Sequence, residues 1–503
     1  MTLAACIAVI GSTASPAFSD AITVSISAVA NGATGIISNQ NSSHTSTDYT
    51  WKKGATDSVE ANLTSGTLTI SNYSNSIVNG TLNATGGTIK LTSGVLTIGS
   101  DSTISSAILN QSYGSTLNIA GGSAYLSDSD SLEGEIVVSS GILGLDGAIL
   151  NDDLTITGGG VISDSNTVIN GTTTISGGSN DFNSTTFGNV SISDGTSSFT
   201  DVSKNGTFTQ TSGSTTIVGS GFDLNNDADN ISGGTLNIGN GSTTTVGVSA
   251  GTIGSDTTVN IDKNSTLNVS DGNISLDSGD TWNGNVNISG GELALIGISK
   301  KNSAKFTQTG GSTTITGNGF NLNNSSDSIL GGDLNIGNDT TTGNMAVSNG
   351  VLYEGANVTI NSGSSLDVAG GNVTLDGATD KWNGSVSNSG GTLTLKDVKK
   401  NSNGTFSQTD GNTTVTGTSF TMNNSADTIS GGTLNVGTST STGKLTVSSG
   451  SITEDATLNI DTNGTIDIKK GDVTIDNSDT WAGNVEVNGG TLNVSNATKT
   501  GSL

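Results

Sequence analysis

The chain has 503 residues, a formal net charge of −27 and 73 glycines, and only 4% of its residues are aromatic. All 16 of its basic residues are lysine, and an acidic chain without arginine is poorly suited to binding phosphate backbones or anionic membrane surfaces. The composition therefore excludes nucleic acid as an expected partner.

The first 19 residues have the pattern of an export signal. An apolar run, "LAACIAVIG" (3–11), precedes small residues, "STASPAFS" (12–19), with Ala17 three positions before a cleavage point after Ser19. "LAAC" also has the form of a lipobox, but six residues leave no room for an apolar segment before Cys6. We predict cleavage by signal peptidase and a location at the cell surface, in the outer membrane or in the extracellular space.

The rest of the chain has the composition of a continuous β-ladder. Pro16 is the only proline, as expected where every backbone donor must join a ladder. Short alternating runs are separated by Gly, Asn, Asp or Ser, which is typical of half-buried strands. After an irregular entry region at 20–59, residues 60–200 follow this pattern with weak register. No stretch has the roughly 20 apolar residues that a membrane span requires.

We predict three superrepeats at 201–298, 299–398 and 399–498, and we interpret 499–503 as a truncated end. "FTQT" at 208–211 returns at 306–309 and, as "FSQT", at 406–409. "DTWNGNVNISGGELAL" (280–295) returns as "DKWNGSVSNSGGTLTL" from 380 and "DTWAGNVEVNGGTLNV" from 479. A repeat of this kind indicates stacked units that share one core.

The predicted fold is all-β: a parallel β-helix (β-solenoid) forming a single elongated rod. Separate sandwiches would need linkers and more aromatic residues in their cores, whereas thin aliphatic strands and small turn residues suit a solenoid. We expect coils of about 20 residues, about five per superrepeat. Gly-Gly pairs are expected at sharp turns with positive φ, and outward Asn, Thr and Ser are expected to form ladders between coils.

Two residue types mark the superrepeats. The tryptophans Trp282, Trp382 and Trp481 are predicted to pack at the same coil corner, with a sugar-stacking platform as the alternative. The aspartates Asp229, Asp327 and Asp427 follow an Asn-Asn pair. We interpret them as turn-capping residues that satisfy backbone donors, because a catalytic carboxylate would occur once rather than in every superrepeat.

The tryptophan unit, W-(N/A)-G-x-V-x-x-x-G-G-x-L-x-(L/V), resembles the autotransporter-associated β-strand repeat of bacterial autotransporter passengers and related surface adhesins. The resemblance covers about two thirds of the chain. It implies a right-handed parallel β-helix displayed outside the outer membrane. That family also carries a C-terminal translocator barrel, whereas this sequence ends in repeat-like "NATKTGSL". We therefore expect either a truncated product or another export route.

The sequence predicts no catalytic, cofactor-binding or metal site. The only histidine, His44, lies before the repeats and is interpreted as a loop residue, so a catalytic triad is not expected. "DSDSLEGE" (128–135) departs from the spacing of an EF-hand calcium loop at Leu132.

The function expected from the sequence is that of a non-enzymatic, adhesin-like surface rod that mediates or spaces cell-surface contacts. Its expected partners are glycans, host matrix, neighbouring cell surfaces or further copies of itself. A structural surface-layer or filament protein is one alternative. A β-helical polysaccharide lyase or glycosidase is the other.

Overall fold

The computed structural model describes residues 103–377 and 379–500, together with residue 86 and nine short strands before residue 100. Every regular element in these residues is a β-strand, and none is a helix. The all-β prediction is therefore confirmed. The predicted export signal at 1–19, with Cys6, and the loop residue His44 lie outside the described residues.

The chain forms two compact units, Met1–Thr207 and Phe208–Leu503. The bounds of the strands in the first unit are Val24–Ser27 (β1), Gly35–Ser38 (β2), Asp48–Lys52 (β3), Val59–Leu63 (β4), Thr67–Ile70 (β5), Ser74–Ile77 (β6), Thr81–Ala84 (β7), Thr88–Leu91 (β8), Gly94–Gly99 (β9), Thr103–Ile104 (β10), Ile108–Gln111 (β11), Ser115–Ser127 (β12), Ser131–Leu132 (β13), Glu135–Asp146 (β14), Ile149–Leu150 (β15), Leu154–Ile156 (β16), Gly160–Asp164 (β17), Val168–Asn183 (β18), Thr186–Thr200 (β19) and Ser203–Lys204 (β20).

The first unit is a parallel β-solenoid. Leu117 in β12 pairs with Ile136 in β14, which pairs with Leu154 in β16 one coil later. All three side chains are fully buried, so each pairing adds a level to an aliphatic column. The pairing of the long strands β12, β18 and β19 is interrupted by register shifts. At these shifts the strand bends, so that one strand forms part of more than one side of a coil.

The strands of the second unit have at most 11 residues each. Their bounds are Phe208–Gln210 (β21), Ser214–Leu224 (β22), Asn230–Ile231 (β23), Gly234–Ile238 (β24), Thr244–Val248 (β25), Thr252–Ile253 (β26), Thr257–Ile261 (β27), Ser265–Val269 (β28), Asn273–Asp277 (β29), Thr281–Trp282 (β30), Asn285–Ile288 (β31), Glu292–Ile296 (β32), Phe306–Gln308 (β33), Ser312–Leu322 (β34), Ser328–Ile329 (β35), Gly332–Ile336 (β36), Gly343–Val347 (β37), Val351–Leu352 (β38), Ala356–Ile360 (β39), Ser365–Val368 (β40), Asn372–Asp376 (β41), Lys381–Trp382 (β42), Ser385–Asn388 (β43), Thr392–Lys396 (β44), Thr405–Gln408 (β45), Asn412–Met422 (β46), Thr428–Ile429 (β47), Thr433–Val436 (β48), Gly443–Val447 (β49), Ser451–Ile452 (β50), Thr457–Ile460 (β51), Gly464–Ile468 (β52), Asp472–Ile475 (β53), Thr480–Trp481 (β54), Asn484–Val487 (β55) and Thr491–Val494 (β56).

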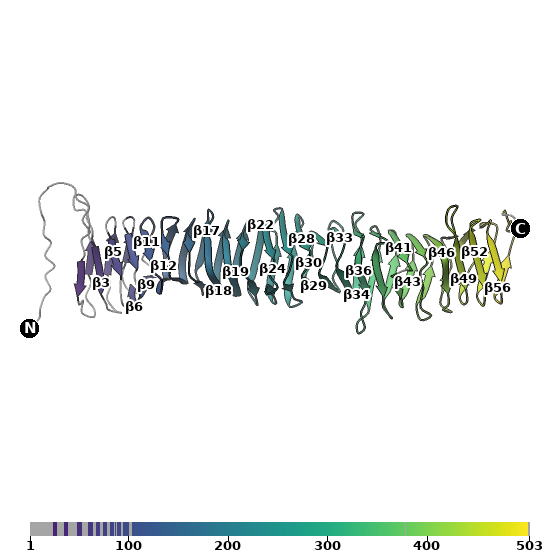
Figure 1. The fold of residues 1–503 in the computed structure, drawn as a ribbon, viewed down its shortest axis with the longest axis horizontal. Helices are drawn as coiled ribbons and strands as arrows, with labels where there is room; N and C mark the ends of the chain where they lie inside the picture. Colours follow the sequence, from purple (N-terminus) through teal and green to yellow (C-terminus); the bar gives the residue numbers. More distant parts are fainter. Residues whose placement is uncertain are drawn as a thin grey trace, which may run out of the picture. The chain divides into compact units, whose positions relative to one another are not determined.

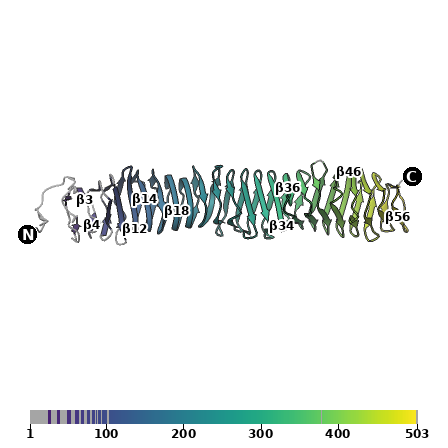
Figure 2. The same cartoon turned by 90° about the horizontal axis from the view of Figure 1, so that it is seen from below.

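The second unit is also a parallel β-solenoid, and its successive strands lie side by side along the unit (Figures 1 and 2). Each coil contributes one strand to each of three ladders. A first ladder runs through β21, β23, β26, β29, β32, β34, β36, β39 and β42. A second runs through β22, β24, β27 and β30. A third starts in the later part of β22 and runs through β25, β28, β31, β33, β35, β38, β41, β44, β46, β48, β51 and β54.

Alternating residues in these strands point into the core. In β24, for example, Leu236 and Ile238 are fully buried, while Asn237 between them is half-buried and faces outward. Burial of each such aliphatic side chain contributes about 1.5–3 kcal/mol. Period-two alternation thus builds the core, as predicted, and the parallel β-solenoid prediction is confirmed for both units.

The Gly-Gly turns are held by the glutamine of the recurring "FTQT" segment. Gln210 Nε2 donates to the carbonyls of Gly233 and Thr235, each at 3.1 Å. Gly234 has φ +77°, and a Cβ there would lie 2.3 Å from the Gly213 carbonyl oxygen in the preceding coil. The predicted positive φ therefore belongs to the second glycine of the pair, where both the turn and the spacing of the coils exclude a side chain.

A superrepeat does not contain a whole number of coils. The first passes through fourteen strand positions: the early and late parts of β22, the strands β21 and β23–β32, and the isolated bridge of Lys300 to Trp282. Three positions complete a coil, so the next superrepeat begins two thirds of the way through the fifth coil. The expectation of about five coils is therefore confirmed, and the structure specifies the number as four and two thirds.

Because a superrepeat does not contain a whole number of coils, the expectation that the tryptophans share one coil corner is wrong. Trp282 lies in the second ladder, Trp382 in the first and Trp481 in the third. The first strand of each superrepeat therefore belongs to a different ladder from the first strand of the preceding superrepeat. Equivalent residues consequently face different sides of the solenoid.

The aromatic contacts of each superrepeat give a test of the core. Phe406 is fully buried, and its ring lies 5.9 Å from Trp382 and 5.6 Å from Phe420. We expect Phe406→Ala to lower the free energy of unfolding by about 3–5 kcal/mol, measured by chemical denaturation of the full chain. Tyr353→Ala is the control, because Tyr353 is 53% exposed and its loss should cost less than about 0.5 kcal/mol. Equal effects of the two changes would contradict this account of the core.

Candidate functional site

A buried polar cluster recurs at the junction of successive superrepeats. Lys300 Nζ lies 2.6 Å from Asp327 Oδ2 and 2.6 Å from Asn323 Oδ1. One superrepeat later, Lys400 Nζ lies 3.0 Å from Asp427 Oδ2 and 2.6 Å from Asn423 Oδ1. We call these two groups the junction clusters. The lysine and aspartate side chains in both have no exposed surface.

The aspartates of these clusters also hold the backbone. Asp327 accepts hydrogen bonds from the backbone N–H groups of Phe306, at 2.8 Å, and Asn324, at 2.9 Å. Asp427 accepts the equivalent pair from Phe406 and Asn424. The pattern is repeated at Asp229, which is buried and accepts from the backbone N–H groups of residues 208 and 226. Each carboxylate therefore caps a turn and joins it to the preceding coil.

Sequence reasoning missed the lysines. Lys300 and Lys400 stand 27 residues before Asp327 and Asp427, in "SKKN" (299–302) and "KKNS" (399–402), and this constant spacing was the available signal. Burial lowers the pKa of both lysine ammonium groups, and the neighbouring aspartates offset part of that effect.

Trp282 and Trp382 pack beside the junction clusters. Trp282 and Trp382 are each 2% exposed, so neither ring presents a face on which a sugar could stack. The Trp282 ring lies 5.8 Å from Phe306 and 5.9 Å from Phe320. Its Nε1 donates to the Gly284 carbonyl at 3.1 Å. Trp481 makes the equivalent bond to Gly483 but is half-buried.

A second carboxylate in each superrepeat precedes the tryptophan. Asp280 accepts from the backbone N–H groups of Val259 and Asp277, each at 2.7 Å, and Asp380 makes the equivalent bonds. Burial raises the pKa of both Asp280 and Asp380 to about 6, although the backbone donors act in the opposite direction.

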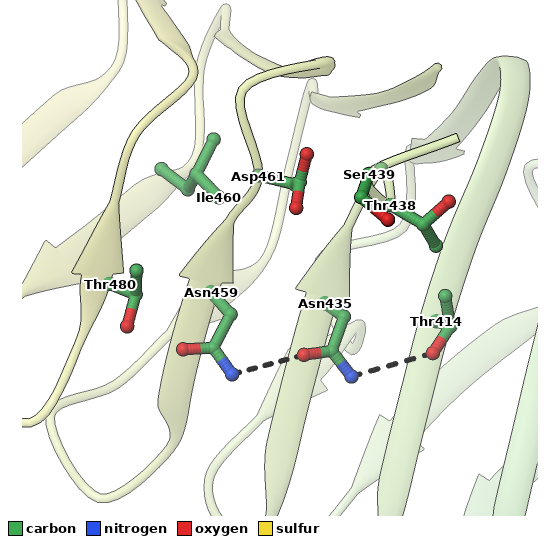
Figure 3. A pocket seen from close by; sticks show the side chains of 9 residues that line it. Thr414, Asn435, Thr438, Ser439, Asn459, Ile460, Asp461 and Thr480 are labelled. Carbon is green, nitrogen blue, oxygen red and sulfur yellow. Dashed lines mark hydrogen bonds between the residues drawn. The ribbon is translucent and has the colours of Figure 1, made fainter. Parts of the chain in front are cut away.

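The surface carries a shallow polar hollow in the third superrepeat. It has a volume of about 430 Å³ and is bordered by an amide ladder across β46, β48 and β51 (Figure 3). Asn459 Nδ2 donates to Asn435 Oδ1 at 3.0 Å, and Asn435 Nδ2 donates to Thr414 Oγ1 at 3.4 Å. This confirms the prediction of outward amide and hydroxyl ladders. Asp461 and Thr438 line the hollow beyond the strand ends.

A second hollow, of about 340 Å³, lies at the corresponding loop of the second superrepeat. Its lining includes Asn338, Asp339 and Asn361, which follow β36 and β39 of the first ladder. The hollow of the third superrepeat follows β48 and β51 of the third ladder. The two hollows therefore open from different ladders, as the fourteen-position repeat requires.

The linings of the hollows suit hydrogen bonding to a polar ligand. They offer amides, hydroxyls and one carboxylate each, Asp461 in one hollow and Asp339 in the other. Hydrolysis of a glycosidic bond by the usual route uses two carboxyl groups that flank the bond. Neither lining includes an aromatic ring, so a sugar would be held by hydrogen bonds without stacking.

No three His, Cys, Asp or Glu side chains gather as a metal site within the described residues. In the "DSDSLEGE" segment, Asp130 caps a turn by accepting from the backbone N–H groups of Leu109 and Ser127. The part of the chain that the structure describes also holds no helix of the length and apolarity needed to cross a membrane.

Comparison with protein-family models and with curated proteins finds no match to this chain.

The raised pKa values of Asp280 and Asp380 predict a pH dependence of stability. The folded groups bind a proton near pH 6, whereas the unfolded groups do so near 3.8. Their contribution to stability is therefore fully present below about pH 4 and is lost as the pH rises through about 6. We expect the difference in thermal midpoint between the native chain and the Asp280→Asn/Asp380→Asn double variant to change over this interval.

The matched control is Asp476→Asn, because hydrogen bonds from Ser478 lower the pKa of Asp476, in the opposite direction to the pKa of Asp280 and Asp380. This variant should track the native chain between pH 4 and 7. A double variant that also tracks the native chain would contradict the assignment.

Proposed function

We propose that this protein is a non-enzymatic, exported β-solenoid that acts at the cell surface as an adhesin-like passenger or spacer. The observation that carries the proposal is the recurrence of a shallow polar hollow on different ladders. A site that recurs along a stacked scaffold and faces more than one side suits repeated weak contacts better than a single chemical step. The resemblance of the tryptophan unit to autotransporter passengers supports the same role.

The proposed ligands are glycans of a host matrix or a neighbouring cell. Asn435, Asn459 and Asp461 supply donors and acceptors that match sugar hydroxyl groups. Since neither hollow's lining has an aromatic platform, each contact is weak. Several contacts on one chain raise the effective concentration and hence the avidity, by about 10²–10⁴ in favourable geometry.

A non-enzymatic role is proposed on chemical grounds. Each hollow presents a single carboxylate, and the junction lysines that could accept a proton in a lyase are fully buried. Exposed polar strands that repeat along the chain also suit the alternative role of a surface-layer or filament component, which would use self-association in place of a glycan partner.

The test is binding of the full chain to immobilised glycans at high and low surface density. We expect retention on dense surfaces and about tenfold weaker retention of the Asn435→Ala/Asn459→Ala variant, because one of several contacts is lost. Asn118→Ala is the control, since Asn118 belongs to an outward ladder of the first unit. Ordered self-assembly without glycan binding would favour the filament role, and release of reducing or unsaturated sugars would overturn the non-enzymatic proposal.

A further inference from the structure

The junction clusters place an amine, a carboxamide and a carboxylate within hydrogen-bonding distance of one another. In both clusters the lysine Nζ lies 2.6 Å from the asparagine Oδ1, and the aspartate Oδ2 lies within 3.0 Å of the same Nζ. The lysine and the asparagine are 23 residues apart, which is about one coil. The same three chemical groups recur in the same arrangement at Lys300 and at Lys400.

The lysine and the aspartate of each cluster are shielded from water, whereas the asparagine is half-buried. The side chains of Lys300 and Asp327 are completely buried. The backbone of Lys300 forms an isolated parallel β-bridge with the backbone of Trp282. Asp327 accepts a hydrogen bond from the backbone N–H of Phe306, and the ring of Phe306 packs on Trp282. A buried ion pair gives little net stability because both charges must be desolvated. Transfer of a proton from the ammonium to the carboxylate removes both charges and leaves a nucleophilic amine.

We propose that Lys300 and Asn323, and likewise Lys400 and Asn423, form intramolecular isopeptide bonds that join consecutive coils, with Asp327 and Asp427 moving the protons. The amine and the amide carbonyl are held in contact by the fold, so the reaction becomes unimolecular, and positioning of this kind is worth several orders of magnitude in rate.

The steps balance without an oxidant or a cofactor. Lys300 Nζ gives a proton to the Asp327 carboxylate and then attacks Cγ of Asn323, which forms the new C–N bond. The carboxyl group of Asp327 passes its proton to Nδ2 of Asn323. The ionised Asp327 then takes the second proton from Nζ of the intermediate and passes it to the departing ammonia. The Cγ–Nδ2 bond then breaks and ammonia leaves. A secondary amide and an ionised Asp327 remain, and ammonia carries the extra proton away as ammonium.

The leaving group has a route to solvent. Asn323 Nδ2 donates to Asn302 Oδ1 at 2.7 Å, and this contact is exposed. The carbonyl oxygen of Asn323 therefore faces the buried lysine, while its nitrogen faces the surface. Asp327 is the less suitable electrophile because both of its oxygens accept backbone hydrogen bonds and its carboxylate carries negative charge.

The test is mass spectrometry of the purified full chain and of its proteolytic peptides. We expect each bond to lower the mass by about 17 Da through loss of ammonia, and a branched peptide to link Lys300 to Asn323. Asn323→Ala should abolish this one bond while leaving Lys300 paired with Asp327. Lys301→Arg is the control, since Lys301 is adjacent but exposed, and it should leave the link intact.

A further variant separates chemistry from folding. Asp327→Asn retains Lys300 and Asn323, and a variant that is folded by circular dichroism should lack the Lys300–Asn323 link. Native chain with full mass at both clusters and free Lys300 and Lys400 side chains would overturn the proposal. A loss of about 18 Da, which corresponds to water, with a peptide linking Lys300 to Asp327 would also overturn it.

Discussion

The structure depends on continuous parallel pairing between successive coils. A strand such as β24 exchanges backbone hydrogen bonds with β22 before it and β27 after it. This arrangement satisfies the backbone polar groups and fixes the register of the side chains. Leu236 is therefore paired with Val259 in the next coil. A side chain that does not fit in one coil would also disturb the packing of the coils on either side of it. The narrow range of residues at inward positions follows from this constraint.

The relation between the superrepeat and the coil decides how the surface is presented. Fourteen strand positions cannot be divided evenly among three ladders, so each superrepeat starts one ladder away from the previous one. A superrepeat of whole coils would align every equivalent loop on one face. The mismatch places the two polar hollows on different sides of the solenoid.

The junction clusters are the main departure from an aliphatic core. Lysine, asparagine and aspartate occupy positions where small aliphatic side chains would suffice for burial, and each cluster sits beside a tryptophan and two phenylalanines. Groups of this polarity are costly to bury unless each finds a partner. Because Asp327 binds two backbone groups and Lys300, the cluster joins neighbouring coils at one defined register. The proposed covalent bond would make that connection permanent.

The sequence by itself determined the local structure and the architecture. Alternation at period two, as in Leu236-Asn237-Ile238, fixes which side chains are buried, and the Gly-Gly pairs mark the turns, because both properties depend on a few adjacent residues. The relation between distant residues was decided only by the tertiary structure. The ladder to which Trp382 belongs depends on how many strands each turn of the chain contains. The pairing of Lys300 with Asp327 depends on the length of one coil, and neither quantity is encoded in a short stretch of sequence.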